Sequence, residues 1–136
     1  SETMRLCAAA PNVPHEVGPD LAFILVEARA LSELTDGAFD VSIGPLTKLW
    51  RRARRRGELP TDADLAAARA RSGWRLLEFD PAAPRVTLKQ PEMHLDFGGI
   101  VKGYAAEEAL KVLREAGIPS ALVAVAGDIA AGAAPP

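Results

Sequence analysis

The stretch HLDFGGIVKGYAAEEALKVL, residues 94–113, restricts the possible fold more than any other part of the sequence. An apolar segment carrying Asp96 meets two adjacent glycines, Gly98 and Gly99, and a helical pattern follows. This order predicts a strand over EMHLDF, a sharp bend, and a helix over 103–116. Glycines at such a bend let the backbone approach a neighbouring group closely, because they carry no side chain.

The bend also has the chemistry of a phosphate site. Backbone amides at the start of a helix attract anions, and Lys102 adds a full positive charge in the same turn. Asp96 can accept hydrogen bonds from a sugar or a polar ring, and a glycine carbonyl can ligate Mg²⁺. The spacing matches neither GxGxxG nor the P-loop. A plain strand–turn–helix, with glycines present only for tight packing, therefore stays open as an alternative.

The patterns before the bend predict three helices. Apolar residues at helical spacing predict a helix over 20–34. Proline at a first helical position predicts a second helix from Gly44, which Gly57 can cap. In the segment TDADLAAARARSG, Thr61 and Asp64 resemble a capping box at the start of a third helix.

Short apolar runs predict several strands. FDVSI alternates like a strand, and WRLLEFD and RVTLK read as two strands around the turn PAAP. ALVAVAGD, after the last helix, reads as a buried strand that ends in a turn. No repeat or low-complexity segment interrupts the chain. The combination of helices and strands predicts the α+β class.

Composition sets limits on this interpretation. The 136 residues suffice for about one domain, and 49% hydrophobic and 25% charged residues are typical of a globular protein. A net charge of -2 gives no global attraction to nucleic acid. The single cysteine, Cys7, excludes an internal disulfide, and no apolar run is long enough to span a bilayer. The chain opens on Ser1 without a methionine, so we expect parts of the domain to be missing at both ends.

Three motifs follow one another along the chain: TDGAFDVSIGPLTKLW over residues 35–50, DFGGIVKGYAAEEA, and ALVAVAGDIAAG. Together, and in this order, they resemble the ApbE family, the FAD:protein FMN transferases. The opening SETMRLCAAA is also similar to the family's early stretch, with Cys7 in place of the usual asparagine. The resemblance covers nearly the whole chain.

The resemblance implies both a fold and a reaction. The fold would be an ApbE-like, T-fold-like domain with a mixed or antiparallel sheet and packed helices. The reaction would be Mg²⁺-dependent transfer of FMN from the substrate FAD to a threonine or serine of an acceptor flavoprotein, with release of AMP. Family members are often exported lipoproteins, so we expect a periplasmic or membrane-anchored protein, while a cytoplasmic location stays open.

Matched position by position, the resemblance assigns site residues. Those expected to contact FAD are Ala38, Phe39, Asp40, Asp96 and Lys102. Gly99 would give a backbone carbonyl to Mg²⁺, and Asp128 would have a structural or supporting role. The family's side-chain metal ligands follow further downstream. We therefore expect residues 1–136 to form a partial flavin transferase domain that is inactive alone, with its catalytic residues outside this chain.

Other interpretations stay open. The parent protein could hold FAD without transferring FMN, or it could be an FAD diphosphatase that yields FMN and AMP. The run RRARRR, residues 51–56, could be a nucleic-acid patch, but aromatic residues are not interleaved with it. We interpret it as a solvated helix end or a contact with the rest of the domain. Trp50 and Trp74 are expected in the core.

Overall fold

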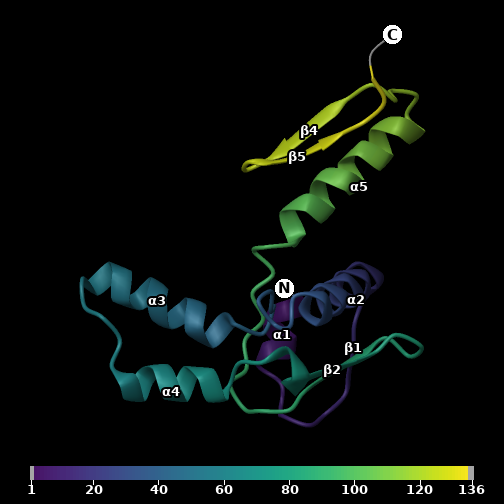
Figure 1. Ribbon diagram of the computed structural model, residues 1–136. Coiled ribbons are helices and arrows are strands. Elements are labelled where there is room, and N and C mark those ends of the chain that lie inside the picture. The colour runs from purple at the N-terminus through teal and green to yellow at the C-terminus, as the bar shows by residue number, and fades with distance from the viewer. Residues whose placement is uncertain (1, 135–136) are drawn as a thin grey trace. The chain divides into compact units, whose positions relative to one another are not determined.

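The computed structural model describes residues 2–134, which divide into two compact units (Figure 1). The N-terminal unit is Ser1–Asp96 and the C-terminal unit is Phe97–Pro136. Both units combine helices with antiparallel strands, so the predicted α+β class is confirmed. Within the described residues, no helix is both long and apolar enough to cross a membrane.

The described part of the N-terminal unit, residues 2–96, contains four α-helices and one three-stranded sheet. The helices are α1 (Glu2–Cys7), α2 (Pro19–Leu34), α3 (Gly44–Arg56) and α4 (Asp62–Ala70), and a 3₁₀ turn, η1, covers Trp74–Leu76. The strands are β1 (His15–Glu16), β2 (Leu77–Asp80) and β3 (Arg85–Leu88). Their order is β1-β3-β2, and both pairs are antiparallel. The predicted strands around the PAAP turn are therefore present, although WRL forms η1.

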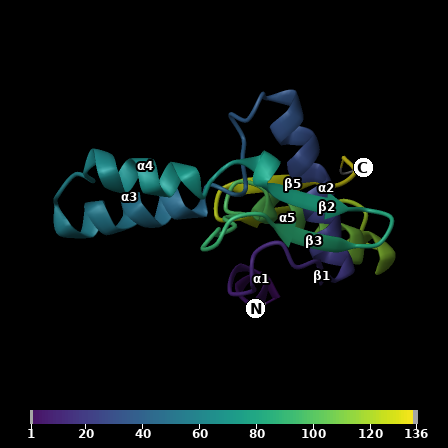
Figure 2. The same ribbon diagram turned by 90° about the horizontal axis from the view of Figure 1, so that it is seen from below.

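The core of this unit lies between α2 and the sheet. In β2, Leu77 is buried while its neighbour Glu78 is exposed, as the alternation of a half-buried strand requires. Leu25 and Ala28 of α2 line the same small cavity as Leu77 and Val41. The apolar face of α2 therefore packs against β2, and Figure 2 shows the helix running beside the sheet.

Helices α3 and α4 form a pair that lies side by side in both views (Figures 1 and 2). Gly57 ends α3 in the left-handed conformation, with φ 69°, and its amide donates to Ala53. The predicted capping box is present at α4, where Thr61 accepts from the Asp64 amide and the Asp64 carboxylate accepts from the Thr61 amide. These local signals placed both helix boundaries correctly.

The C-terminal unit is a helix packed on a hairpin. Helix α5 covers Val101–Glu115, and the hairpin pairs β4 (Leu122–Val125) with β5 (Asp128–Ala131). Ala106 and Leu110 of α5 form a small core with Ala130 of the hairpin. Ala126 and Gly127, both with positive φ, make the two-residue turn, which suits the twist of a hairpin.

Four sequence predictions about this architecture are wrong. FDVSI and EMHLDF form no strand. They meet in an isolated parallel bridge between Ile43 and His94, and the Asp96 amide donates to the Val41 carbonyl oxygen. FDVSI forms a turn because the Asp40 carboxylate accepts a hydrogen bond from the Ser42 amide at 2.7 Å. Such a contact, between residues two apart, is typical of a turn and not of a strand. The strand predicted to be buried, β4, is exposed on one of its two faces, the face that carries Leu122. Trp50 is 49% exposed and does not belong to the core.

Candidate functional site

Two predicted motifs, distant in sequence, lie side by side within the N-terminal unit. The amide of Asp96 donates to the carbonyl oxygen of Val41 at 2.7 Å, and the amide of Gly44 donates to that of His94 at 3.1 Å. The Leu95 amide, next to Asp96, lies 3.4 Å from the sulfur of Cys7 and donates to it. The start of α3 and the segment that carries Asp96 are therefore joined through their backbones.

The Asp96 carboxylate is held by two side chains from α3. Its Oδ2 accepts from the Thr47 hydroxyl at 2.9 Å and from the Arg51 guanidinium at 3.0 Å. The Asp96 side chain is 21% exposed, whereas that of Arg51 is 66% exposed. A carboxylate fixed in this way is a pre-oriented acceptor at the surface, suited to a ligand hydroxyl or amide.

The predicted FAD contacts Ala38 and Phe39 lie in a turn that follows α2. Asp36 and Gly37 take the left-handed conformation, with φ 48° and 82°. The Phe39 amide then donates to the Thr35 hydroxyl at 3.0 Å, which fixes the turn. Ala38 is exposed and Phe39 is half-buried, so a ligand can reach both residues.

Asp40, the third residue of that motif, bonds to its own chain. Its Oδ1 accepts from the Ser42 amide and the Ser42 hydroxyl, both at 2.7 Å. Its Oδ2 accepts from the Trp74 amide at 2.9 Å, and the Ser42 hydroxyl lies 2.7 Å from the Gly73 amide. Asp40 therefore ties the motif to the start of η1. Its predicted contact with FAD stays a prediction.

In the C-terminal unit, Lys102 pairs with Asp128. The Lys102 ammonium, in the first turn of α5, lies 2.9 Å from Asp128 Oδ2 at the start of β5. Both side chains are partly exposed. Asp128 thus orients Lys102, which agrees with a supporting role, and the contact of Lys102 with FAD stays a prediction.

Gly99 lies in the turn that leads into α5. The amides of Ile100 and Val101 both donate to the carbonyl oxygen of Phe97 at 3.0 Å, which closes this turn. Within residues 2–134, no group of three or more His, Cys, Asp or Glu side chains could hold a metal. A single carbonyl at Gly99 is a poor match for Mg²⁺, which takes carboxylates and waters. These residues do not fit a Mg²⁺ site by themselves.

Sequence reasoning missed the residues that position Asp96. These are Cys7, Gly44, Thr47 and Arg51. One signal was available, because Gly44, Thr47 and Arg51 follow each other at three and four residues and so share one face of α3. Nothing in the sequence indicated that this face meets Asp96.

Comparison with known proteins agrees with the motifs. A "FAD:protein FMN transferase" of Klebsiella pneumoniae is 34% identical over 129 residues, which is 95% of this chain and 41% of that protein. One of Haemophilus influenzae is 31% identical over 124 residues, 88% of this chain and 36% of that protein. The chain therefore spans about two fifths of the length of these relatives.

Solved structures show the same fold. The flavin transferase ApbE of Vibrio cholerae matches with a TM-score of 0.88 and 30% identity, over 97% of this chain and 43% of that one. The ApbE protein of Thermotoga maritima matches with a TM-score of 0.82 and 30% identity, over 95% of this chain and 42% of that one. The family model for ApbE matches residues 1–136. By motifs, fold and sequence, this chain belongs to the ApbE family.

Proposed function

We propose that the intact protein transfers FMN from FAD to a threonine or serine hydroxyl of a target flavoprotein and releases AMP. The whole chain matches the ApbE family, and the relatives reported above are named FAD:protein FMN transferases. The chain covers only part of those relatives, so the activity is assigned to the intact protein and not to residues 1–136 alone.

One observation carries this proposal: the pairing of the 41–44 segment with the 94–96 segment around Asp96. The pairing joins the motif that contains Ala38 and Phe39 to a carboxylate that Thr47 and Arg51 hold in place. Such a carboxylate can accept a hydrogen bond from a ribose hydroxyl or a ring N–H of FAD. Because the Asp96 side chain is already oriented, it loses little further conformational entropy when FAD binds.

The reaction replaces one phosphorus–oxygen bond with another. The acceptor hydroxyl oxygen bonds to the FMN phosphorus, the diphosphate linkage of FAD breaks, AMP leaves, and the hydroxyl proton passes to solvent or base. Negative charge builds on the leaving phosphate, so cations near the diphosphate favour the reaction. Lys102 would supply one such charge, and the amides at the start of α5 would supply partial charges.

We also propose that Mg²⁺ assists this reaction by neutralising the diphosphate. Gly99 would contribute its carbonyl oxygen, and the side-chain ligands would come from outside residues 2–134. Titration of the intact protein with Mg²⁺ in the presence of FAD, followed by flavin fluorescence, tests this assignment. A flavin signal and a transfer rate that EDTA leaves unchanged would refute it.

We further propose that the protein acts in the periplasm or at a membrane surface, as its resemblance to exported lipoproteins implies. Fractionation of the native cells, with an antibody against this chain, tests the location. Recovery of the protein with a cytoplasmic marker would overturn this proposal and leave the chemistry untouched.

The decisive experiment incubates the intact protein with FAD, Mg²⁺ and a candidate acceptor flavoprotein, and then analyses all products by mass spectrometry. Covalent FMN on the acceptor together with free AMP supports the transferase. Free FMN and AMP with an unmodified acceptor would mean an FAD diphosphatase instead. Bound, unchanged FAD would mean a binding module.

A variant of Asp96 tests the site itself. Asp96→Ala in the intact protein should weaken FAD binding by at least about tenfold, because it removes a charged acceptor. Glu27→Ala is the matched control, since Glu27 is an exposed acid of α2 and the charge change is the same. Flavin fluorescence titration gives both affinities, and thermal unfolding shows whether each variant is folded. Equal FAD affinities in the two folded variants would refute the role of Asp96.

A further inference from the structure

A groove of about 720 Å³ lies between α3 and α4 in the N-terminal unit. Each helix lines it with residues at positions i, i+3, i+4 and i+7, which form one face of a helix. The row on α3 is Lys48, Arg51, Arg52 and Arg55. The row on α4 is Asp64, Ala67 and Ala68, and Arg71, the residue that follows the last residue of α4, continues it. Leu49 and Pro45 also line it, and Glu92 and His94 complete the lining.

The lining is strongly basic. It contains five Lys or Arg side chains and only two carboxylates, although the chain as a whole has a net charge of -2. Positive charge is therefore concentrated in this groove, although the net charge of the whole chain is negative. Within residues 2–134, Lys48 and Arg55 make no ion pair. Two cations of the groove are thus available to an incoming anion.

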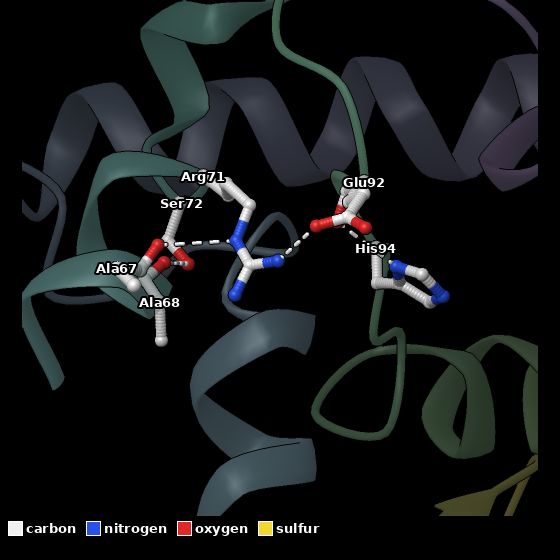
Figure 3. A network of polar contacts seen from close by, with 6 residues as sticks. All are labelled: Ala67, Ala68, Arg71, Ser72, Glu92 and His94. Carbon is white, nitrogen blue, oxygen red and sulfur yellow. Dashed lines mark hydrogen bonds and ion pairs between the residues drawn. The ribbon is translucent and has the colours of Figure 1, made fainter. Parts of the chain in front are cut away.

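Arg71 is fixed in place (Figure 3). Its Nε donates to the carbonyl oxygen of Ala67 at 3.0 Å, and its guanidinium pairs with the Glu92 carboxylate. The backbone carbonyl of Glu92 in turn lies 3.1 Å from His94 Nδ1. Arg71 is therefore held by both α4 and the 92–94 segment, and it presents a cation with reduced freedom to move.

We propose that this groove binds an acidic, extended segment of a partner protein. Lys48 and Arg52, like Arg51 and Arg55, are four residues apart, a rise of about 6 Å along a helix. Alternate side chains of an extended peptide are separated by about 6.6 Å on one face. Acidic residues at alternate positions of such a peptide can therefore meet successive cations of α3. The small side chains of Ala67 and Ala68 leave room for its backbone.

A nucleic acid fits the groove less well. The lining residues include no Phe, Tyr or Trp on which a base could stack, and Asp64 and Glu92 would repel a continuous phosphate backbone. A peptide can instead place carboxylates beside Lys48 and Arg55 and small residues beside Asp64. On the transferase function proposed above, the partner that carries this acidic segment is the acceptor flavoprotein.

The first test measures peptide binding in the intact protein. The probe is a fluorescein-labelled decapeptide of alternating Glu and Ser. Fluorescence anisotropy at low ionic strength measures its binding. The double variant Lys48→Ala, Arg55→Ala should bind the probe about five- to tenfold more weakly, as expected for the loss of two exposed charge pairs. Binding should also weaken as salt is added, because exposed charges are screened.

The matched control is the double variant Arg54→Ala, Arg56→Ala. These arginines belong to the same helix and the same basic run but do not line the groove, and the change in net charge is identical. Their loss should change probe affinity less than about twofold. Equal weakening in both double variants would mean unspecific attraction to the basic helix and would overturn the proposal. Absence of probe binding to the unchanged protein would overturn it as well.

A second measurement separates this proposal from the transferase assignment. With the acceptor flavoprotein as variable substrate, the groove variant should raise the KM for the acceptor and leave both kcat and the KM for FAD unchanged. An unchanged KM for the acceptor would refute the acceptor as partner. If the unchanged protein transfers no FMN at all, the proposed reaction fails, while the peptide measurement still decides whether the groove binds acidic segments.

Discussion

The Gly44 amide donates to the His94 carbonyl oxygen at 3.1 Å, and a Cβ on Gly44 would overlap that same carbonyl group. The two backbones therefore approach so closely that no side chain fits between them. This contact aligns the start of α3 with the segment that carries Asp96. Gly44 is required here by the space available and not by a special φ angle.

We expect Gly44→Ala to lower the free energy of unfolding by about 1–3 kcal/mol, because the new methyl group must displace backbone. Gly103→Ala is the control, since nothing lies within 4 Å of a Cβ built on Gly103 in α5. That change should be neutral or stabilise by up to about 1 kcal/mol, as alanine favours a helix. Urea unfolding of the intact protein gives both values. Similar losses in the two variants would contradict the role given to Gly44.

Asp40 should contribute to stability through the turn that it organises. Asp40→Asn should cost about 1–3 kcal/mol, because an amide cannot accept all the hydrogen bonds from Ser42 and Trp74 that the carboxylate accepts. Asp36→Asn removes the same charge from a side chain that is 96% exposed and should change stability by less than about 0.5 kcal/mol. Thermal unfolding of both variants measures the difference, and equal melting temperatures would disprove the assignment.

Variants of the Lys102–Asp128 pair distinguish a role in the stability of the fold from a role in FAD binding. Because both side chains are partly exposed, Lys102→Met should change the stability by no more than about 1 kcal/mol. If Lys102 contacts the FAD diphosphate, the same variant should weaken FAD binding by about threefold or more. Asp128→Asn frees Lys102 from its partner, so FAD affinity should stay equal or rise. Equal weakening by both variants would mean that the pair acts only on the fold.

Asp64 gives the fold a defined dependence on pH. Hydrogen bonds from the Thr61 side chain and backbone lower the pKa of Asp64 below its ordinary value of 3.8, and Arg52 lowers it further. A carboxyl group with a lowered folded pKa stabilises the protein above its unfolded pKa, and this stabilisation is lost as pH falls through the folded pKa. The stability difference between the unchanged protein and Asp64→Asn should therefore shrink below about pH 4.

The measurement is urea unfolding of both proteins between pH 5.5 and pH 3. Asp62→Asn is the control, because it removes an acid from the same turn of α4 without removing the capping box. A stability difference for Asp64→Asn that stays constant over the whole range would show that the box contributes nothing through ionisation.

Local signals predicted α2, α3, α4 and α5 but not the short helix α1, and the segments between the helices depended on distant partners. The boundaries at Gly57 and Thr61 follow from the conformation and hydrogen bonding of neighbouring residues, which a sequence displays. The alternation in FDVSI was read as a strand, but Asp40 bonds to Trp74, 34 residues away, and the segment turns. Propensity could not reveal that contact, because it depends on where η1 packs.

In the candidate site, too, the sequence revealed local features but not the contacts between distant residues. The resemblance singled out Asp96. Thr47 and Arg51, which hold its carboxylate, lie in a helix that was interpreted from the sequence only through its proline start, its Gly57 cap and its basic end. The groove between α3 and α4 was equally hidden. The arginine run was visible in the sequence, but only the packing of the two helices shows that Arg52 and Arg55 line the groove while Arg54 and Arg56 do not.

The hairpin of the C-terminal unit has a practical consequence for handling the protein. Val123 and Val125 pack against α5, whereas Leu122 and Ile129 are 66% and 65% exposed. A two-stranded ribbon with apolar side chains on both faces and open edges readily recruits other strands. Produced in isolation, residues 97–134 would tend to precipitate, so purification and crystallisation should keep this ribbon within the longest available polypeptide.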